Sequence, residues 1–253
     1  MPVALITGAS AGLGAEFARQ LAARGADLVL VARNVDALDE LAAGLRDGFG
    51  VDVQVMPADL TDERDVDRVA ARLADAAEPV DLLINNAGFG LPLRFADNDV
   101  EDEVRHLRVH VEAPMRLMHA ALRTMRGRGG RIVNVASVAG FISRSTYSAC
   151  KAWVIGFSRW ANAEYASDGV TVTALCPGFT HTSFHERMGL EPGKEGVPAI
   201  GWLDAGDVVR EGLRDAARGK AVSVPSTRYK IVVAVTCVLP RSLIARAARR
   251  GRM

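Results

Sequence analysis

Residues 3–25 read VALITGASAGLGAEFARQLAARG, and this stretch decides the fold. The apolar run from Val3 to Ile6 predicts a short buried strand, because a continuous apolar segment bounded by turn residues is typical of a strand covered on both faces. After a turn of small residues, the pattern predicts a helix to about Arg24 that ends at Gly25. The chain therefore opens with a strand, a glycine-rich turn and a helix.

The turn contains three glycines, Gly8, Gly12 and Gly14. Glycine lets the backbone bend tightly and lets phosphate oxygens approach, and the start of the helix offers unpaired N–H groups and the positive end of its dipole to an anion. The spacing differs from the common G-x-G-x-x-G fingerprint, and such a turn is also compatible with a plain tight connection. Its position directly after the first strand favours a dinucleotide site.

Six further segments have the pattern of strands and alternate with helical patterns: residues 26–32, 51–56, 80–84, 131–135, 170–175 and 221–224. Parallel strands joined by helical crossovers form a sheet that helices cover on both faces. The sequence therefore predicts an α/β fold with a doubly wound sheet of seven mainly parallel strands. It contains no internal repeat or linker, so we expect residues 1–253 to form a single domain.

The chain has 253 residues, of which 49% are hydrophobic and 24% charged, and its formal net charge is +1. This near-neutral balance disfavours a nucleic-acid partner, so we expect a small-molecule partner. Cys150, Cys176 and Cys237 lack metal-like spacing and are odd in number, which predicts no metal site and a reducing, cytoplasmic compartment. The longest apolar run, residues 231–239, is too short to span a bilayer, and the N-terminus lacks a secretory leader pattern.

Ligands of doubly wound sheets bind beyond the carboxyl ends of the strands, and Arg33 follows the second strand. Proteins that bind NAD usually place a carboxylate there for the ribose 2′-hydroxyl, whereas an arginine accommodates the 2′-phosphate of NADP. We therefore expect NADP(H) rather than NAD(H), with the Ser10 hydroxyl as a second donor to that phosphate. The alternative is that Arg33 is only a solvated residue at the start of a helix.

Polar and small residues also follow the third and fourth strands. Asp59 comes after the third strand and is either an acceptor for an adenine amine or a turn acid near a helix start. The fourth strand ends in two amides and two small residues, Asn85, Asn86, Ala87 and Gly88. Such residues suit a close approach between the backbone and a ligand.

The fifth strand leads into residues 137–151, which read SVAGFISRSTYSACK. Tyr147 and Lys151 are four residues apart, so on a helix they share one face, and a lysine cation beside a phenol lowers the phenol pKa. Together with Ser137 they form a candidate proton-transfer unit. A Tyr-x-x-x-Lys pattern also arises by chance in many helices, but this one follows the same edge of the sheet as the glycine turn.

Two later segments stand out. Residues 179–202 are rich in Gly and Pro and predict a substrate lid, whose apolar members join others near the expected cleft: Phe89, Leu91, Phe141, Phe179, Phe184, Met188 and Leu190. The tail, residues 226–253, combines an apolar run with several arginines. A solvated helix end is its simplest interpretation, and peripheral contact with an anionic membrane or partner is the alternative.

In combination and order, these motifs resemble the short-chain dehydrogenase/reductase (SDR) family. The matching elements are TGASAGLG (Thr7–Gly14), Asp59-Leu60, NNAG (Asn85–Gly88), Ser137, YSACK (Tyr147–Lys151) and PGFTHT (Pro177–Thr182). The resemblance implies a Rossmann-type sheet, an NAD or NADP cofactor and hydride transfer between nicotinamide and a carbonyl or alcohol. It also implies a homodimer or homotetramer, which pairs through helices near residues 97–125 and 145–167.

The resemblance further implies residue roles. Tyr147 would be the general acid in carbonyl reduction and the base in the reverse direction, while Ser137 holds the substrate oxygen. Lys151 would bind the nicotinamide ribose and lower the pKa of Tyr147. The residues implied for cofactor binding are Gly8, Ser10, Ala11, Gly12, Leu13, Gly14, Arg33, Asp59, Leu60, Asn86, Ala87, Gly88, Tyr147, Lys151, Pro177, Gly178 and Thr182.

The chain departs from the family at His110, where relatives have a fourth catalytic residue, an asparagine, in a long helix that Pro114 should bend here. Histidine preserves the proton relay if the backbone carbonyl is what holds a relay water, and its imidazole can also carry protons itself. If the amide side chain is required, the relay is impaired. A second departure is the short spacing between Ser137 and Tyr147, which opens the pocket.

Two functions follow. The first is an NADP(H)-dependent oxidoreductase that acts on a carbonyl or alcohol of an apolar small molecule. The alternative is a dinucleotide-binding sensor or scaffold with little catalysis.

Overall fold

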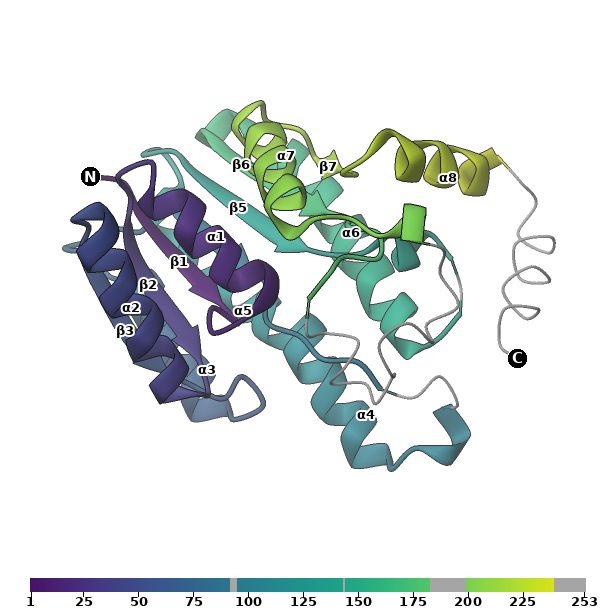
Figure 1. Cartoon of the computed structure of the whole chain (residues 1–253), viewed down its shortest axis with the longest axis horizontal. Helices are drawn as coiled ribbons and strands as arrows, with labels where there is room; N and C mark the ends of the chain where they lie inside the picture. The colour runs from purple at the N-terminus through teal and green to yellow at the C-terminus, as the bar shows by residue number, and fades with distance from the viewer. Residues whose placement is uncertain (92–94, 143, 183–198, 239–253) are drawn as a thin grey trace.

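The computed structural model of the chain describes residues 1–91, 95–142, 144–182 and 199–238 (Figure 1). Seven parallel strands form one sheet in the order β3-β2-β1-β4-β5-β6-β7. The strands are β1 Val3–Thr7, β2 Asp27–Ala32, β3 Val53–Pro57, β4 Leu82–Asn85, β5 Gly130–Val135, β6 Val170–Leu175 and β7 Val222–Ser223. The predicted doubly wound, Rossmann-type sheet is confirmed.

Helices cover both faces of the sheet. One face carries α1 (Gly12–Ala22), α2 (Val35–Phe49) and α7 (Ala205–Ala217), and the other carries α3 (Glu63–Leu73), α5 (Ala113–Met125) and α6 (Thr146–Glu164). Neighbouring side chains of β1 point to opposite faces of the sheet. Ile6 packs with the fully buried Phe17 of α1, whereas Leu5 packs in the layer on the other face. Each short apolar strand is thereby buried on its two faces.

The order of the strands reverses at β1, which lies between β2 and β4. At such a switch point the crossovers leave to opposite sides, and a crevice opens beyond the carboxyl ends of the two central strands. Thr7, the last residue of β1, is followed by the glycine turn, and Asn85, the last residue of β4, is followed by Asn86. The topology therefore places both motifs at the crevice.

The long helix is interrupted at the place where a bend was predicted. The helix consists of α4 (Val100–Leu107), a π-helical turn (Arg108–Glu112) and α5, whose second residue is Pro114. Proline has no N–H to donate to the carbonyl four residues earlier, and an inserted π turn is a common way to accommodate that loss. The π turn itself, which contains His110, was not predicted.

The remaining elements are short, apart from the C-terminal helix. They are the 3-10 turns Phe95–Asp97, Val138–Phe141, Ala166–Asp168 and Ala199–Gly201, and the helix α8 (Thr227–Val238). The last follows β7 and extends away from the sheet (Figure 1). Within the described part of the chain, no helix has the length and apolarity required to cross a membrane. Residues 183–198 of the predicted lid and 239–253 of the tail lie outside the described residues.

Candidate active site

The glycine turn folds tightly onto itself. Gly8 and Gly12 adopt φ values of +66° and +55°, a region that side chains disfavour. A Cβ on Gly14 would lie 2.1 Å from the Gly8 carbonyl oxygen, and one on Gly12 would lie 3.3 Å from Cβ of Thr182. The turn therefore needs glycine for its own closure, and Thr182 from the segment after β6 lies over it.

Asn86 ties this turn to the end of β4. Its amide Nδ2 donates to the carbonyl oxygens of Thr7 at 3.0 Å and Gly8 at 3.2 Å. In return the Thr7 hydroxyl oxygen accepts from the backbone N–H groups of Asn86 at 3.0 Å and Ala87 at 3.1 Å. The motif at the end of β4 is thus brought against the glycine turn and holds its backbone in place.

The start of α1 fits a dinucleotide phosphate. Its N-cap residue, Ala11, has no side chain that can accept from the first N–H groups, whereas the N-caps of α2, α3, α4, α6 and α7 all make that bond. Those N–H groups and the helix dipole suit an anion, and the glycines leave room for it. The cradle would hold the pyrophosphate of a nicotinamide dinucleotide through the backbone at Ala11, Gly12 and Leu13.

Arg33 is exposed directly after β2. Among the residues that the structure describes, none holds its guanidinium in an ion pair or a hydrogen bond. Asp59, after β3, accepts from the backbone N–H and the hydroxyl of Thr61, both at 2.9 Å. Arg33 is therefore available to a ligand anion. Asp59 stabilises the turn before α3, which agrees with its alternative interpretation as a turn acid.

The structure brings Ser137, Tyr147 and Lys151 together beyond the end of β5. The Ser137 side chain hydrogen-bonds Tyr147, and its oxygen also accepts from the Ala139 N–H at 3.1 Å. The buried Lys151 Nζ lies 5.5 Å from the centre of the Tyr147 ring and donates to the carbonyl of Val135, the last residue of β5, at 2.7 Å. This lysine is thus anchored to the strand that delivers the serine.

Burial controls the titration of this pair. Desolvation raises the pKa of Tyr147 to about 12, against the lowering effect of the Ser137 hydrogen bond. Desolvation also lowers the pKa of Lys151 to about 8. The expectation was that Lys151 lowers the pKa of Tyr147, whereas the pKa lies above its usual value because desolvation outweighs the Ser137 hydrogen bond. Tyr147 is therefore protonated at neutral pH.

His110 lies against both the tyrosine and the end of β4. Its ring centre is 5.5 Å from that of Tyr147, and its Nε2 is 2.7 Å from the carbonyl oxygen of Phe89. A Cβ on Gly88 would lie 2.5 Å from the ring, so this glycine makes room for the imidazole. Burial lowers the pKa of His110 well below its usual value, so the ring is neutral at pH 7.

A second buried histidine, His106, belongs to the same cluster, and sequence reasoning missed it. Its ring centre lies 4.3 Å from that of His110, and its Nδ1 is 3.9 Å from Sγ of Cys150. Glu103, His106 and His110 are spaced three and four apart, a signal that they share one helix face. Among the described residues, one buried polar atom of each has no hydrogen-bond partner: Glu103 Oε2, His106 Nε2 and His110 Nδ1.

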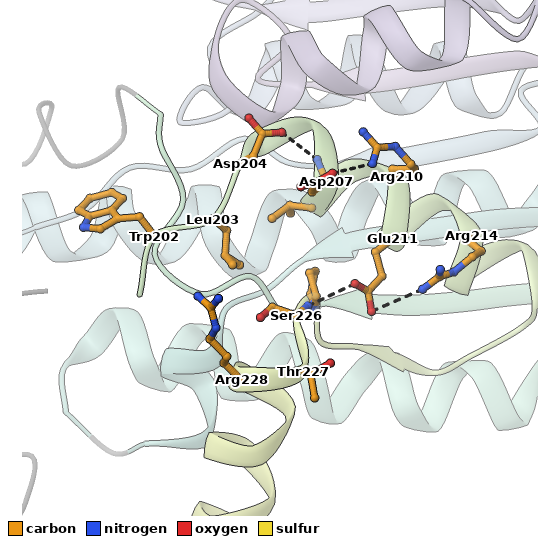
Figure 2. Close-up of a pocket in the computed structure, with 12 residues that line it drawn as sticks. Trp202, Leu203, Asp204, Asp207, Arg210, Glu211, Arg214, Ser226, Thr227 and Arg228 are labelled. Atoms are coloured by element: carbon orange, nitrogen blue, oxygen red, sulfur yellow. Dashed lines mark hydrogen bonds and ion pairs between the residues drawn. The ribbon is translucent and has the colours of Figure 1, made fainter. Parts of the chain in front are cut away.

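A separate cavity of about 560 Å³ lies between α7 and the start of α8 (Figure 2). It contains none of the predicted site residues. Acidic and basic side chains around it pair with one another, as Glu211 does with Arg214 and Asp207 with Arg210. Because of these pairs, the cavity has no unbalanced charge that would select a charged ligand. The carboxyl edge of the sheet is therefore the better candidate for the active site.

The fold and the glycine turn together define a Rossmann-type dinucleotide-binding protein. A family model described as short chain dehydrogenase matches residues 2–192. Nodulation protein G of Rhizobium meliloti (strain 1021) is 38% identical over 192 residues, which are 73% of this chain and 76% of that protein. The chain belongs to the short-chain dehydrogenase/reductase family.

Solved structures agree with this assignment. A short-chain dehydrogenase from Sphingobium yanoikuyae in complex with NADPH has a TM-score of 0.85 and 36% identity, covering 93% of each chain. The bulky-bulky ketone specific alcohol dehydrogenase from Comamonas testosteroni has a TM-score of 0.80 and 31% identity, covering 96% of each chain. The chain is therefore an oxidoreductase of a family that acts on alcohols and ketones and binds a nicotinamide dinucleotide.

The buried His106 predicts a pH-dependent loss of stability. Desolvation lowers its pKa to about 4, against the attraction of Glu103, while in the unfolded chain it titrates near 6.5. As the pH falls from 6.5 towards 4 the unfolded chain takes up a proton that the folded protein does not, so stability falls in that window. This titration lowers the unfolding free energy of the wild type by about 2 kcal/mol between pH 7.5 and pH 5. We expect His106→Gln to remove that part of the pH dependence.

Urea unfolding at the two pH values measures this difference. His119, an exposed histidine on α5, provides the matched control, and His119→Gln should leave the difference as it is in the wild type. An equal pH effect in the wild type and in His106→Gln would show that His106 titrates normally in the folded protein.

Proposed function

We propose that the protein is an NADP(H)-dependent oxidoreductase that reduces a carbonyl group on an apolar small molecule. The observation that carries this proposal is the grouping of Ser137, Tyr147 and Lys151 at the carboxyl edge of β5, beside a glycine cradle that fits a dinucleotide. A bound nicotinamide would supply the hydride, and the chain would supply position and protons. On this proposal, residues 1–253 work as one catalytic domain.

Tyr147 is suited to act as the general acid. Because burial raises its pKa to about 12, it retains its proton at neutral pH and can give it to an alkoxide that develops on the substrate. Ser137 would donate its hydroxyl proton to the same oxygen and hold the carbonyl in line with the phenol. This protonation state favours reduction over alcohol oxidation near pH 7.

Lys151 would return charge and protons to Tyr147. With a pKa of about 8 it exchanges its proton far more readily near neutral pH than an exposed lysine does. Its bond to the Val135 carbonyl keeps the ammonium below the phenol ring. We also assign it the binding of the nicotinamide ribose hydroxyls, as the family implies.

His110 would serve the proton relay in place of the family's asparagine. Pro114 cannot donate to the His110 carbonyl, which leaves that oxygen able to accept from a relay water. The buried imidazole Nδ1 has no hydrogen-bond partner among the described residues, and it is a second acceptor in the tautomer whose Nε2–H donates to the Phe89 carbonyl. The backbone role would be independent of the side chain, so histidine and asparagine would both support it.

Apolar side chains support an apolar substrate. Phe89 lies against His110, and Phe179 packs against Trp202 with ring centres 5.7 Å apart. Phe141 and Leu91 are half-buried near the same edge, while Phe184 lies outside the described residues. The relative from Comamonas testosteroni is named for bulky ketones, which is consistent with this class of substrate.

The choice of NADP(H) over NAD(H) would rest on Arg33 and Ser10. The Arg33 guanidinium, unpaired among the described residues, follows β2, where dinucleotide folds bind a 2′-phosphate, and the two residues directly after β2 are Arg33 and Asn34 rather than a carboxylate for a 2′-hydroxyl. The structure from Sphingobium yanoikuyae contains NADPH, which gives further support. The remaining cofactor contacts are those expected from the family motifs.

The aromatic face of α6 supports a homo-oligomer. Trp153, Phe157, Trp160 and Tyr165 follow one another with ring centres 5.0 to 6.0 Å apart, and Trp160 is 51% exposed. The other three are half-buried, and a row of half-buried aromatic rings with an exposed tryptophan suits a partner helix from a second copy. The homodimer or homotetramer stays a prediction that light scattering decides, and the cytoplasmic location stays a prediction from the cysteine count.

Tyr147→Phe tests the proposed reaction. The variant lacks the proton that the alkoxide must receive, so we expect NADPH oxidation with a panel of apolar ketones and aldehydes to fall at least about 1,000-fold. NADPH binding, measured by fluorescence, should change less than about threefold, because the ring and its surroundings stay. Turnover equal to that of the wild type would contradict the role of Tyr147.

Two companion measurements separate the alternatives. His110→Asn should retain turnover within about fivefold if the backbone carbonyl is the relay group. A wild type that binds NADPH tightly but turns over no member of a broad panel would favour the dinucleotide sensor or scaffold.

Arg33→Gln tests the cofactor. Removal of the guanidinium should weaken NADPH binding about 10- to 100-fold, because a charge-assisted contact with a phosphate is lost, and should leave NADH binding nearly unchanged. The matched control is Arg123→Gln, which alters an exposed arginine near the C-terminal end of α5. An equal loss for both cofactors, or a wild-type preference for NADH, would overturn the assignment.

The C-terminal tail supports a peripheral contact with an anionic membrane. Residues 227–253 contain seven Arg and Lys and no Asp or Glu, although the whole chain has a net charge of +1. On α8 the apolar Ile231, Val232 and Val235 are 61%, 45% and 48% exposed. Apolar and basic residues together favour an anionic bilayer surface.

Vesicle sedimentation tests this contact. We expect binding to vesicles of phosphatidylserine and phosphatidylcholine, little binding to phosphatidylcholine alone, and loss of binding in Ile231→Ser/Val235→Ser. Equal behaviour with both vesicle types would leave the solvated helix end as the correct interpretation.

A further inference from the structure

The side chain of Tyr229, in the first turn of α8, contacts the segment that follows β6. Its hydroxyl oxygen accepts from the Phe179 N–H at 3.1 Å, and the same hydroxyl donates to the Gly201 carbonyl at 2.7 Å. One phenol has one proton and free lone pairs, so both bonds exist together. The hydroxyl therefore joins the residues before and after the stretch 180–200.

Gly178 and the Tyr229 ring are fitted to each other. A Cβ on Gly178 would lie 2.0 Å from Cζ and 2.1 Å from Cε2 of the ring, distances at which no side chain can exist. Gly178 is not among the glycines with positive φ, so its backbone conformation alone does not require glycine. The Tyr229 ring therefore occupies the space that a Cβ on Gly178 would need.

The segment held in this way leads directly to the catalytic residues. The carbonyl of Pro177 accepts from the N–H of Val138, the residue after Ser137, at 3.0 Å. Further along, Leu203 donates to the Phe179 carbonyl at 2.8 Å and accepts from the His181 N–H at 3.0 Å. Thr182, one residue on, lies over Gly12 in the glycine cradle. A shift at Gly178 would therefore move groups at both the serine and the cradle.

The first turn of α8 is itself firmly attached. Lys230 Nζ lies 2.5 Å from Oε1 of Glu211. The Ser226 N–H donates to the other oxygen of that carboxylate at 3.2 Å, as Figure 2 shows. Arg228 donates to the Ile200 carbonyl. Tyr229 and Val233 also pack with the 3-10 turn that follows Ser137. Both sequence neighbours of Tyr229, Arg228 and Lys230, are therefore held by contacts outside α8, which restrict the position of Tyr229.

We propose that Tyr229 is a positioning residue for the active site, through which α8 holds Gly178 and Phe179 in the geometry needed for cofactor and substrate. The inference deepens the proposed function and rests on it. The match to the family model ends at residue 192, so α8 lies outside the part of the chain that matches the family. The contact is therefore a feature of this chain's C-terminal region that the family motifs do not contain.

A double-mutant cycle tests the proposal on the full chain. Gly178→Ala places a methyl group inside the Tyr229 ring, and we expect it to lower both kcat/KM for ketone reduction and NADPH affinity about 100-fold or more. In Tyr229→Ala/Gly178→Ala the methyl group has room, and both quantities should recover at least about tenfold over Gly178→Ala. Strict additivity of the two changes would overturn the proposal.

Tyr229→Phe isolates the hydroxyl. It keeps the ring, so the melting temperature should stay within about 2 °C of the wild type, while kcat/KM should fall about tenfold because the bonds to Phe179 and Gly201 are lost. Tyr165→Phe, which removes the hydroxyl of a half-buried tyrosine distant from the cradle, is the matched control and should leave kcat/KM unchanged. Equal kcat/KM in Tyr229→Phe and the wild type would overturn the role.

NADPH affinity distinguishes the failure of this inference from that of the proposed reaction. If the wild type binds NADPH but reduces nothing, the proposed reaction has failed, and recovery of NADPH affinity in the double variant still supports the positioning role. If the wild type reduces ketones and the double variant recovers neither quantity, the positioning role has failed alone.

Discussion

Asn86 donates to the carbonyl oxygens of Thr7 and Gly8, and this contact fixes the ends of β1 and β4 relative to each other. The strand order reverses between these strands, so their ends border the crevice of the sheet. The closure leaves no room for a side chain at Gly8 or Gly14 and leaves the start of α1 uncapped. This geometry suits a phosphate, and β5 brings Ser137 to the same edge of the sheet.

Desolvation then gives these residues their chemistry. The same burial raises the pKa of Tyr147 to about 12 and lowers that of Lys151 to about 8, because both charged forms lose hydration. A protonated phenol next to a lysine that titrates near neutral pH suits proton donation to an alkoxide. The neighbouring His106 and His110 are neutral for the same reason, so of these two histidines and Lys151 only the lysine carries a charge near neutral pH.

Much of this arrangement could be predicted from sequence, because strands such as β1 and turns such as Gly8–Gly14 depend on local pattern. The contribution of His106 depends on the π turn, which sets the two histidine rings 4.3 Å apart, and that of Tyr229 on a contact with Gly178 across 51 positions of sequence. Neither has a local signature. The pKa of Tyr147 was expected to fall because the nearby lysine was visible in the sequence, whereas the extent of burial depends on tertiary packing.

The pH dependence of kcat/KM for ketone reduction by the wild type tests the central claim most directly, because it reports the groups of the free enzyme. The account predicts a constant value from neutral pH to about 8 and a decline above it as Lys151 loses its proton, while Tyr147 remains protonated. A profile that stays level to pH 10, where an ordinary lysine is still charged, would contradict the buried Tyr147–Lys151 pair as the source of the activity.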